Sequence, residues 1–255
     1  MDQSALDRDT TLLQRAPMLA ACRDGPASRS TIAERAGCSR TTAYRATTDL
    51  AARGLLEQVE GGYRLTGLGT TVLGRIERLR AELDGARRLR PVLDCIDAPE
   101  LRANTHLFAD ATVVAADAGA PYAVEQHVES TIADASERIY GAASSFGSPT
   151  TLTRTVERIE AGVEFAWALP QVVLDRLVRQ HGALHERVLA RDTTSVYVVE
   201  EVPVDFSVYD DTLALTAFDP DRGTLEAVAT TDDPAALEWA RDRFEAHCER
   251  GERLG

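Results

Sequence analysis

A polar segment of ten residues, 39–48, gathers side chains that can hydrogen-bond to a flat or charged surface. An arginine can donate two hydrogen bonds to a guanine edge, a threonine can contact a thymine methyl group or a phosphate, and a tyrosine can donate to a phosphate. Arg45 or Arg40 is therefore expected to contact guanine, and Tyr44 a phosphate. The full set is Ser39, Arg40, Thr41, Thr42, Tyr44, Arg45 and Thr48.

Two short helices are expected before this segment. Residues 16–23 predict the first, with a proline in its first turn and an Asp-Gly-Pro sequence after its end. The second is expected to begin at Ser30, with Thr31 and Glu34 at the spacing of a capping box, and to end near Gly37. Thr31 is also a candidate contact.

The third helix carries the polar segment. Gly37 can adopt the left-handed backbone of a tight turn, and Ser39 can cap the helix that follows. A short helix, a glycine turn and a longer helix with a polar outer face are the geometry that places a helix in the major groove of DNA. A stripe at i, i+3, i+4 and i+7 is expected to face the core, and its members are Ala43, Ala46, Thr47 and Leu50.

Two short strands follow, and they predict a β-hairpin. Residues 55–59 and 63–66 flank a Gly-Gly pair that suits a tight turn. Such a wing can lie along the DNA backbone or in the minor groove, and Tyr63 and Arg64 are its expected contacts.

Residues 15–66 resemble the winged-helix domains of archaeal transcription regulators. The resemblance rests on RAPMLAACRDGP, on STIAERAGCSRTTAYRATTDLAARGLLE and on GGYRLT. It implies that residues 1–67 form a winged helix-turn-helix domain that binds double-stranded DNA with sequence specificity. One alternative stays open, in which the winged helix docks a protein or binds DNA as an architectural module without sequence choice.

The charge is unevenly distributed along the chain. The net charge is -13, all 28 basic residues are arginine, and lysine is absent. Residues 1–70 contain nine arginines and eight acids, whereas residues 71–255 contain nineteen arginines and thirty-three acids. An acidic, lysine-free composition resembles that of proteins from salt-loving archaea, although a GC-rich genome would also favour arginine. At molar salt a near-neutral DNA-binding face is physically tolerable, because screening is strong and counterion release contributes little.

Residues 68–99 predict a connecting helix that dimerises. One winged helix reads too few base pairs to select a genomic site, whereas a homodimer doubles the contact set. The alternative is that the apolar stripe of this helix packs within one chain. The stripe is close to the a/d pattern of a two-stranded coiled coil and consists of Leu68, Val72, Ile76, Leu79, Leu83 and Ala86.

Residues 100–255 predict an α/β domain, so the whole chain is expected to be of the α+β class. Its order of elements resembles the effector domain of archaeal regulators of the methanogenesis filament-regulator type, which are similar to sugar-sensing regulators built on a phospholipase-D-like half domain. The resemblance rests on the stretch 122–127 and on DDPAALEWARDRFE, and it implies a small-molecule effector. Strands are expected at 111–116, 138–143, 163–169 and 195–199, an antiparallel continuation at 206–218 and 225–229, and a last helix at 233–249.

A pocket for the effector is expected where strands of this domain end, because pockets of α/β sheets usually open there. Helix capping and ordinary loop polarity are the alternative explanation of these residues. The candidate ligand-binding residues are Asp117, Tyr122, Glu125, His127, Ser144 and Ser145.

We expect no enzymatic activity and no cofactor. A phospholipase-D-type site needs a histidine nucleophile with a lysine two residues on, and this chain has no lysine. The sequence also contains no P-loop, nucleophile elbow, HExxH motif or Gly-rich dinucleotide loop. An enzyme with a DNA-targeting domain remains an alternative, and it would need a site that none of these motifs describes.

Metal, disulfide and membrane interactions are not expected either. His181 and His185 have a spacing that zinc sites use, but no third ligand is near them. The four cysteines are scattered and form no C-x-x-C pair. The sequence has neither a run of about 18 apolar residues nor the apolar core of a signal peptide, so we expect a cytoplasmic protein.

Overall fold

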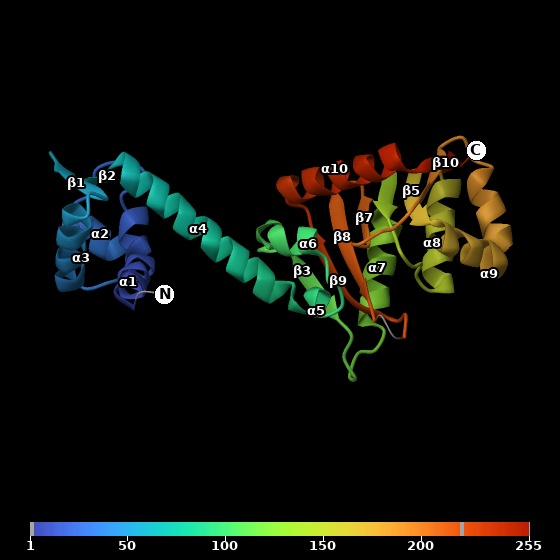
Figure 1. Cartoon of the computed structure of the whole chain (residues 1–255), viewed down its shortest axis with the longest axis horizontal. Helices are drawn as coiled ribbons and strands as arrows, with labels where there is room; N and C mark the ends of the chain where they lie inside the picture. Colours follow the sequence, from blue (N-terminus) through green and yellow to red (C-terminus); the bar gives the residue numbers. More distant parts are fainter. Residues whose placement is uncertain (1–2, 220–221, 255) are drawn as a thin grey trace. The chain divides into compact units, whose positions relative to one another are not determined.

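The protein is described by a computed structural model, which covers residues 3–219 and 222–254. The chain divides into two compact units, residues 1–80 and 81–255, each with a hydrophobic core of its own. The division falls inside helix α4 (Gly67–Arg88), within the predicted connector (Figure 1). The α+β class expected from the sequence is confirmed.

The first unit is a small set of helices with a β-hairpin. Its elements are α1 (Gln3–Ala20), α2 (Arg29–Arg35), α3 (Arg40–Ala52), β1 (Leu56–Val59) and β2 (Gly62–Leu65), followed by α4. Leu19, Ile32 and Leu50, one from each of the first three helices, are fully buried in its core. An isolated bridge between Ala27 and Tyr63 ties the segment before α2 to the hairpin.

Helix α1 is longer than the sequence pattern predicted. We expected residues 16–23, but the helix begins at Gln3 and holds Pro17 in its interior. The apolar spacing that buries Ala16 and Leu19 starts at Leu12, before the proline. Packing of this face against the core therefore outweighs the backbone hydrogen bond that the proline removes.

The start of α2 is also corrected. Ser28, not Ser30, caps this helix, because its Oγ accepts a hydrogen bond from the backbone N–H of Thr31 at 3.2 Å. The Thr31 hydroxyl lies 2.9 Å from Ser28 Oγ, so Thr31 does not form the predicted capping box with Glu34. The bridge from Ala27 holds the preceding chain extended, and Ser28 is the first residue after it.

The second unit is built on an eight-stranded sheet with the order β10-β6-β5-β4-β7-β8-β9-β3. Strands β4, β5 and β6 run parallel, and the other neighbours pair antiparallel. The predicted strands are confirmed, with ends shifted by a few residues. The strands are β3 (Thr112–Ala115), β4 (Arg138–Ala142), β5 (Glu164–Pro170), β6 (Thr194–Val199), β7 (Phe206–Tyr209), β8 (Thr212–Phe218), β9 (Leu225–Thr231) and β10 (Glu252–Leu254).

Helices cover both faces of this sheet (Figure 1). On one face, α7 buries Val128 and Ile132 against Ile139 of β4. On the other face, α10 places the ring of Trp239 against Phe206 of β7. The helices are α5 (Arg90–Leu93), α6 (Pro99–Ala103), α7 (Ala123–Asp134), α8 (Pro149–Glu160), α9 (Gln171–Leu189) and α10 (Pro234–Arg250).

The segment after α4 was expected to belong to the connecting helix at 68–99, but α4 ends at Arg88. The segment forms α5, α6 and a 3-10 turn (Thr105–Phe108), which bury Val92, Leu101 and Phe108 on the α10 side of the sheet. Helices of four or five residues are stabilised by tertiary packing rather than by local propensity. Strand β10, which pairs with β6 at one edge of the sheet, was likewise not expected.

The apolar stripe of α4 is partly buried within the chain and partly exposed, so it fits neither packing within one chain nor dimerisation alone. Ile76 is buried, and Val72 packs partly against the core of the first unit. Leu68, Leu79 and Leu83 expose 55%, 41% and 46% of their surface. Half of the predicted dimer contacts therefore stay exposed on a single chain.

Candidate nucleic-acid interface

Helix α3 is held on one side only. Gly37 has a φ of 63°, and the Ser39 Oγ accepts a hydrogen bond from the backbone N–H of Thr42 at 3.1 Å, so the predicted turn and cap are confirmed. The side of the helix that faces away from the core is exposed. The residues of the predicted core stripe are all buried: Ala43, Ala46, Thr47 and Leu50.

The polar face of α3 is exposed as predicted. Every residue of the set is exposed: Ser39, Arg40, Thr41, Thr42, Tyr44, Arg45 and Thr48. The Thr48 hydroxyl donates to the Tyr44 carbonyl oxygen at 2.9 Å, which is a local helix contact. Within the described part of the chain, the side chains of Arg40 and Arg45 make no hydrogen bond or ion pair. Their guanidinium groups keep every donor for an external acceptor.

The sequence pattern did not reveal Arg29, the first residue of α2. Its guanidinium lies 4.3 Å from the ring centre of Tyr44 and 5.1 Å from that of Tyr63. It also donates to the Thr47 Oγ1 at 3.2 Å and to the Tyr63 hydroxyl. One cation thereby joins α2, α3 and β2 and fixes the position of Tyr44 on the exposed face. Its three partners are distant along the chain, so no local spacing indicates the contact.

Of the two contacts predicted on the hairpin, only Arg64 is exposed. Side chains alternate between the faces of a strand, so Tyr63 points into the core and Arg64 points outward. Tyr63 is only 6% exposed, which corrects its assignment as a DNA contact. Arg64 is exposed and forms an ion pair with Glu57 at 2.7 Å. To contact Arg64, a DNA phosphate would have to replace the Glu57 carboxylate. The ion pair between Arg64 and Glu57 is exposed to water and therefore weak.

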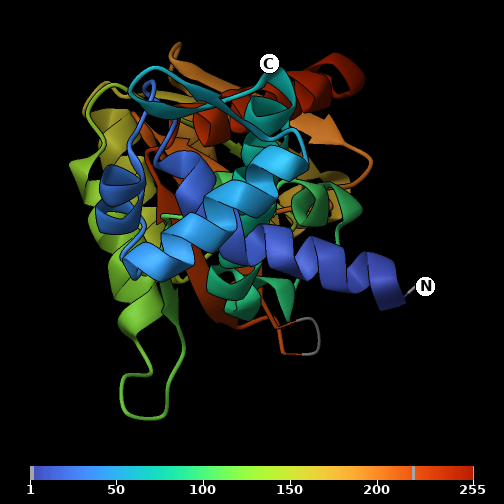
Figure 2. The same ribbon diagram turned by 90° about the vertical axis from the view of Figure 1, so that its left-hand side faces the viewer.

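The six predicted effector residues do not come together in the second unit. Strands β3 and β4, which precede them, are separated by β7, β8 and β9, or roughly 19 Å at ordinary strand spacing. Asp117 and Tyr122 lie in the loop between β3 and α7, which extends away from the sheet in both views (Figure 1 and Figure 2). Tyr122 exposes 68% of its surface, and Asp117 Oδ1 accepts a hydrogen bond from the N–H of Gly119.

The other four residues fall into two places. His127 Nε2 lies 3.0 Å from Thr230 Oγ1, at a polar cavity of about 450 Å³. Glu125, on the same helix, has one carboxylate oxygen buried without a partner among the described residues. Ser144 and Ser145 lie after β4, beside a residue that the sequence pattern did not single out.

That residue is Asp205, whose side chain is buried at the start of β7. Its Oδ1 accepts a hydrogen bond from the Ser144 N–H at 2.8 Å, and its Oδ2 has no partner in the described ranges. Burial raises the pKa of Asp205 to about 6, and the hydrogen bond from Ser144 opposes this only in part. In the sequence, the signal that could have identified Asp205 was its position as the one acid in the mainly apolar run 202–208.

Two family models match the sequence. One is described as the methanogenesis regulatory protein FilR1, middle domain, and it matches residues 121–250, half of the chain. The other is the HVO_A0261 N-terminal domain, which matches residues 3–88. The chain belongs to the FilR1 family of archaeal transcription regulators. As a member of the FilR1 family, it is a DNA-binding transcription regulator, and the resemblance stated for the second domain is confirmed.

Solved structures show more distant similarity to this FilR1-family chain. TrmBL2, an archaeal chromatin protein, is 14% identical, with 95% of this chain and 94% of that chain covered and a TM-score of 0.46. Nuc from Salmonella typhimurium, a phospholipase D family member, is 15% identical, with 57% and 99% covered and a TM-score of 0.44. NucT from Helicobacter pylori is 12% identical, with the same coverage and a TM-score of 0.47. No curated protein matches the sequence.

The family model that matches residues 121–250 is that of a regulatory protein. In the described ranges, no helix has both the length and the apolar character needed to cross a membrane. Nor do three or more His, Cys, Asp or Glu residues gather there in a way that could hold a metal. The side chain of His185 lies outside the described residues, and the four cysteines are free thiols.

Proposed function

We propose that this FilR1-family regulator binds a specific inverted-repeat DNA sequence as a homodimer and that a small molecule modulates the binding. In this proposal residues 1–67 bind DNA, residues 68–99 connect and dimerise, and residues 100–255 hold the effector. The observation that carries it is the exposed face of α3, where two arginines keep all their donors. Arg40, Thr41, Thr42 and Arg45 lie at the start of α3, where a recognition helix meets base edges.

The dimer part of the proposal is supported by α4. Leu79 and Leu83 are one helical turn apart, and both stay exposed on a single chain. A second copy of the chain would cover them in a two-stranded coil. A monomeric mass in light scattering at molar potassium chloride would contradict the dimer.

The effector part requires a ligand that binds one arrangement of the two DNA-binding domains more tightly than another. Only such differential affinity can change DNA binding, and the coupling is reciprocal. A ligand that raises the affinity for DNA must therefore itself bind more tightly when DNA is present.

The proposal is tested by selecting genomic DNA fragments with the purified protein at molar potassium chloride and sequencing those retained. Enrichment of one inverted-repeat motif is expected. Retention without a motif would instead favour an architectural DNA-binding module, and no retention would favour a protein-docking module.

Replacing Arg45 with alanine is expected to weaken binding to the selected sequence by about 1–3 kcal/mol, because one guanidinium can contact a guanine with two hydrogen bonds. Binding to unrelated DNA should change much less. Arg53 is the matched control, since it lies at the end of the same helix and pairs with Asp49 at 2.7 Å. Arg53→Ala should keep the discrimination between the two DNAs. An equal loss on both DNAs in Arg45→Ala would make Arg45 a phosphate contact.

Replacing Arg29 with alanine is expected to weaken both folding and DNA binding, although Arg29 need not touch DNA. The change removes two cation–π contacts and two hydrogen bonds, and it should lower the free energy of unfolding by about 1–2 kcal/mol. The control is Arg23→Ala, which removes only the exposed ion pair with Glu77. Chemical denaturation and a DNA-binding titration measure the two effects. Equal behaviour of the two variants would contradict the positioning role of Arg29.

A further inference from the structure

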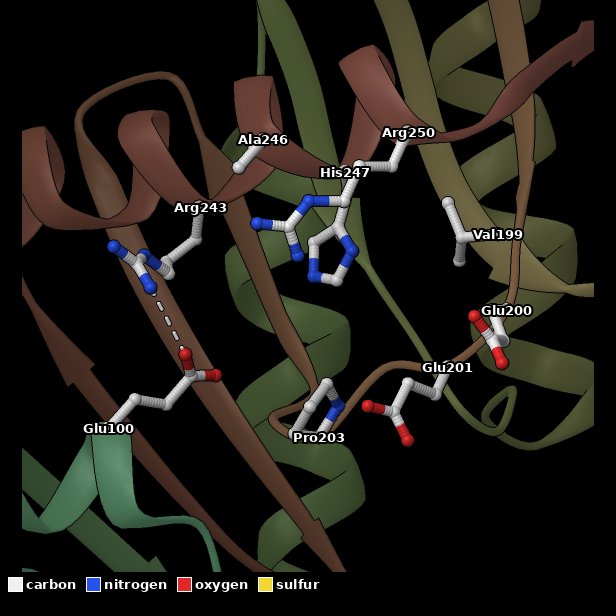
Figure 3. Close-up of a pocket in the computed structure, with 9 residues that line it drawn as sticks. All are labelled: Glu100, Val199, Glu200, Glu201, Pro203, Arg243, Ala246, His247 and Arg250. Carbon is white, nitrogen blue, oxygen red and sulfur yellow. Dashed lines mark hydrogen bonds and ion pairs between the residues drawn. The ribbon is translucent and has the colours of Figure 1, made fainter.

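A small polar cavity opens in the second unit, between the segment after β6 and the last turns of α10 (Figure 3). It lies at the carboxyl end of a parallel strand, the edge where ligands of open α/β sheets bind. Its volume of about 200 Å³ is below the roughly 300–1,000 Å³ of pockets for drug-sized ligands, so it suits a small metabolite. None of the six residues that the sequence predicted for an effector lines it.

One wall of this cavity is basic. Arg243, His247 and Arg250 lie at i, i+4 and i+7 on α10, and their side chains extend from one face of the helix (Figure 3). Arg243 donates from Nη1 to Glu100 at 3.1 Å, and its Nε is buried without a partner in the described ranges. The side chain of Arg250 makes no hydrogen bond or ion pair with any described residue. This wall therefore keeps unused donors for an anionic group.

The facing wall is acidic. Glu200 and Glu201 directly follow β6, and both are exposed. Although two arginines line the same cavity, neither glutamate forms an ion pair or hydrogen bond within the described part of the chain. Val199 and Pro203 add apolar surface beside them.

The cavity has charges of both signs, and these restrict the chemistry of a ligand. Arg250, Glu200 and Glu201 have no ion pair in the described ranges, whereas Arg243 pairs with Glu100 and keeps further donors. An anion alone would neutralise the arginines but lie close to two carboxylates, and a cation alone would lie close to the guanidinium groups. A molecule that carries a carboxylate and an ammonium group can make charge-assisted hydrogen bonds to both walls at once.

We propose that this cavity binds a free α-amino acid, with its carboxylate against Arg243 and Arg250 and its ammonium group against Glu200 and Glu201. This inference deepens the proposed function, because it gives the chemical class of the effector. Binding is measured without DNA, so its failure is distinct from a failure of DNA recognition.

The test is isothermal titration of the full chain with each proteinogenic amino acid at molar potassium chloride. At least one is expected to bind saturably. Its N-acetyl and amide derivatives each lack one of the two charges and should bind about tenfold more weakly or worse. Arg250→Gln and Glu201→Gln should each cause a similar loss. Both residues are exposed, and thermal unfolding will verify that the variants fold.

Arg241→Gln is the matched control, since Arg241 lies on α10 but does not line the cavity. It should leave the affinity unchanged. The proposal is overturned if no amino acid binds at millimolar concentration, if the N-acetyl derivative binds as well as the free amino acid, or if Arg250→Gln and Arg241→Gln behave alike. Sequence-specific DNA binding without amino-acid binding would overturn this inference alone. Amino-acid binding without DNA specificity would overturn the proposed function alone.

Discussion

Replacing Gly62 with alanine is expected to unfold the hairpin of the first unit and abolish DNA binding. Gly62 has a φ of 140°, and an added Cβ would lie 2.2 Å from the carbonyl oxygen of Ala27. Ala27 cannot easily move away, because its bridge to Tyr63 has hydrogen bonds of 2.8 and 2.9 Å. Backbone strain together with the loss of both bonds should lower the free energy of unfolding by about 3–5 kcal/mol.

Gly61→Ala is the control for this prediction. Gly61 also has a positive φ, of 90°, but the nearest atom to an added Cβ is that of Pro26, at 4.0 Å. An alanine at position 61 would therefore suffer only from the unfavourable positive φ, which should lower the free energy of unfolding by about 1–2 kcal/mol. Denaturant unfolding of the full chain and a DNA titration measure both variants. Equal destabilisation would show that the close approach to Ala27 does not matter.

The stability of the second unit is expected to fall as the pH rises from about 4 to above 6, because of Asp205. Burial raises the pKa of this side chain from 3.8 to about 6 in the folded protein. The folded state therefore holds the proton more tightly than the unfolded state, and protonation favours folding. The stabilisation is complete at a pH below the pKa that Asp205 has in the unfolded chain. It is lost as the pH rises through the pKa that Asp205 has in the folded protein. Two pH units correspond to roughly 3 kcal/mol.

Asp205→Asn removes this titration, so the free energy of unfolding should become flatter with pH and should exceed that of the wild type near neutral pH. Asparagine keeps an oxygen that can accept from the Ser144 N–H. Denaturant unfolding at constant salt, between about pH 4 and 8, measures the effect. A pH dependence that is unchanged in the variant would mean that Asp205 does not titrate in this range.

Asp210 provides a control of opposite sign. Burial acts to raise its pKa, but hydrogen bonds from the backbone N–H groups of Arg138, Ser136 and Glu137 lower the pKa below its ordinary value. Its contribution to stability is present above the ordinary pKa and is lost as the pH falls. Asp210→Asn should therefore destabilise the protein near neutral pH, where Asp205→Asn stabilises it.

The sequence by itself determined the helix-turn-helix and the hairpin. Three features are involved: the Ser39 cap, the Gly37 turn and the stripe from Ala43 to Leu50. Each of them depends on residues that lie within about two helical turns of one another. Signals of this range depend on backbone conformation and on a helical period, and both can be read along the chain. The same locality explains why the predicted strands of the second unit were confirmed.

Only the tertiary structure decided which side chains from distant segments lie close together. Arg29 meets Tyr44 and Tyr63 because α2, α3 and β2 pack together, and the same packing turns Tyr63 inward. The sheet order separates the six predicted effector residues, whereas it brings the segment after β6 beside α10. Strand order is set by the burial of apolar faces that lie far apart in the chain, so no local period encodes it.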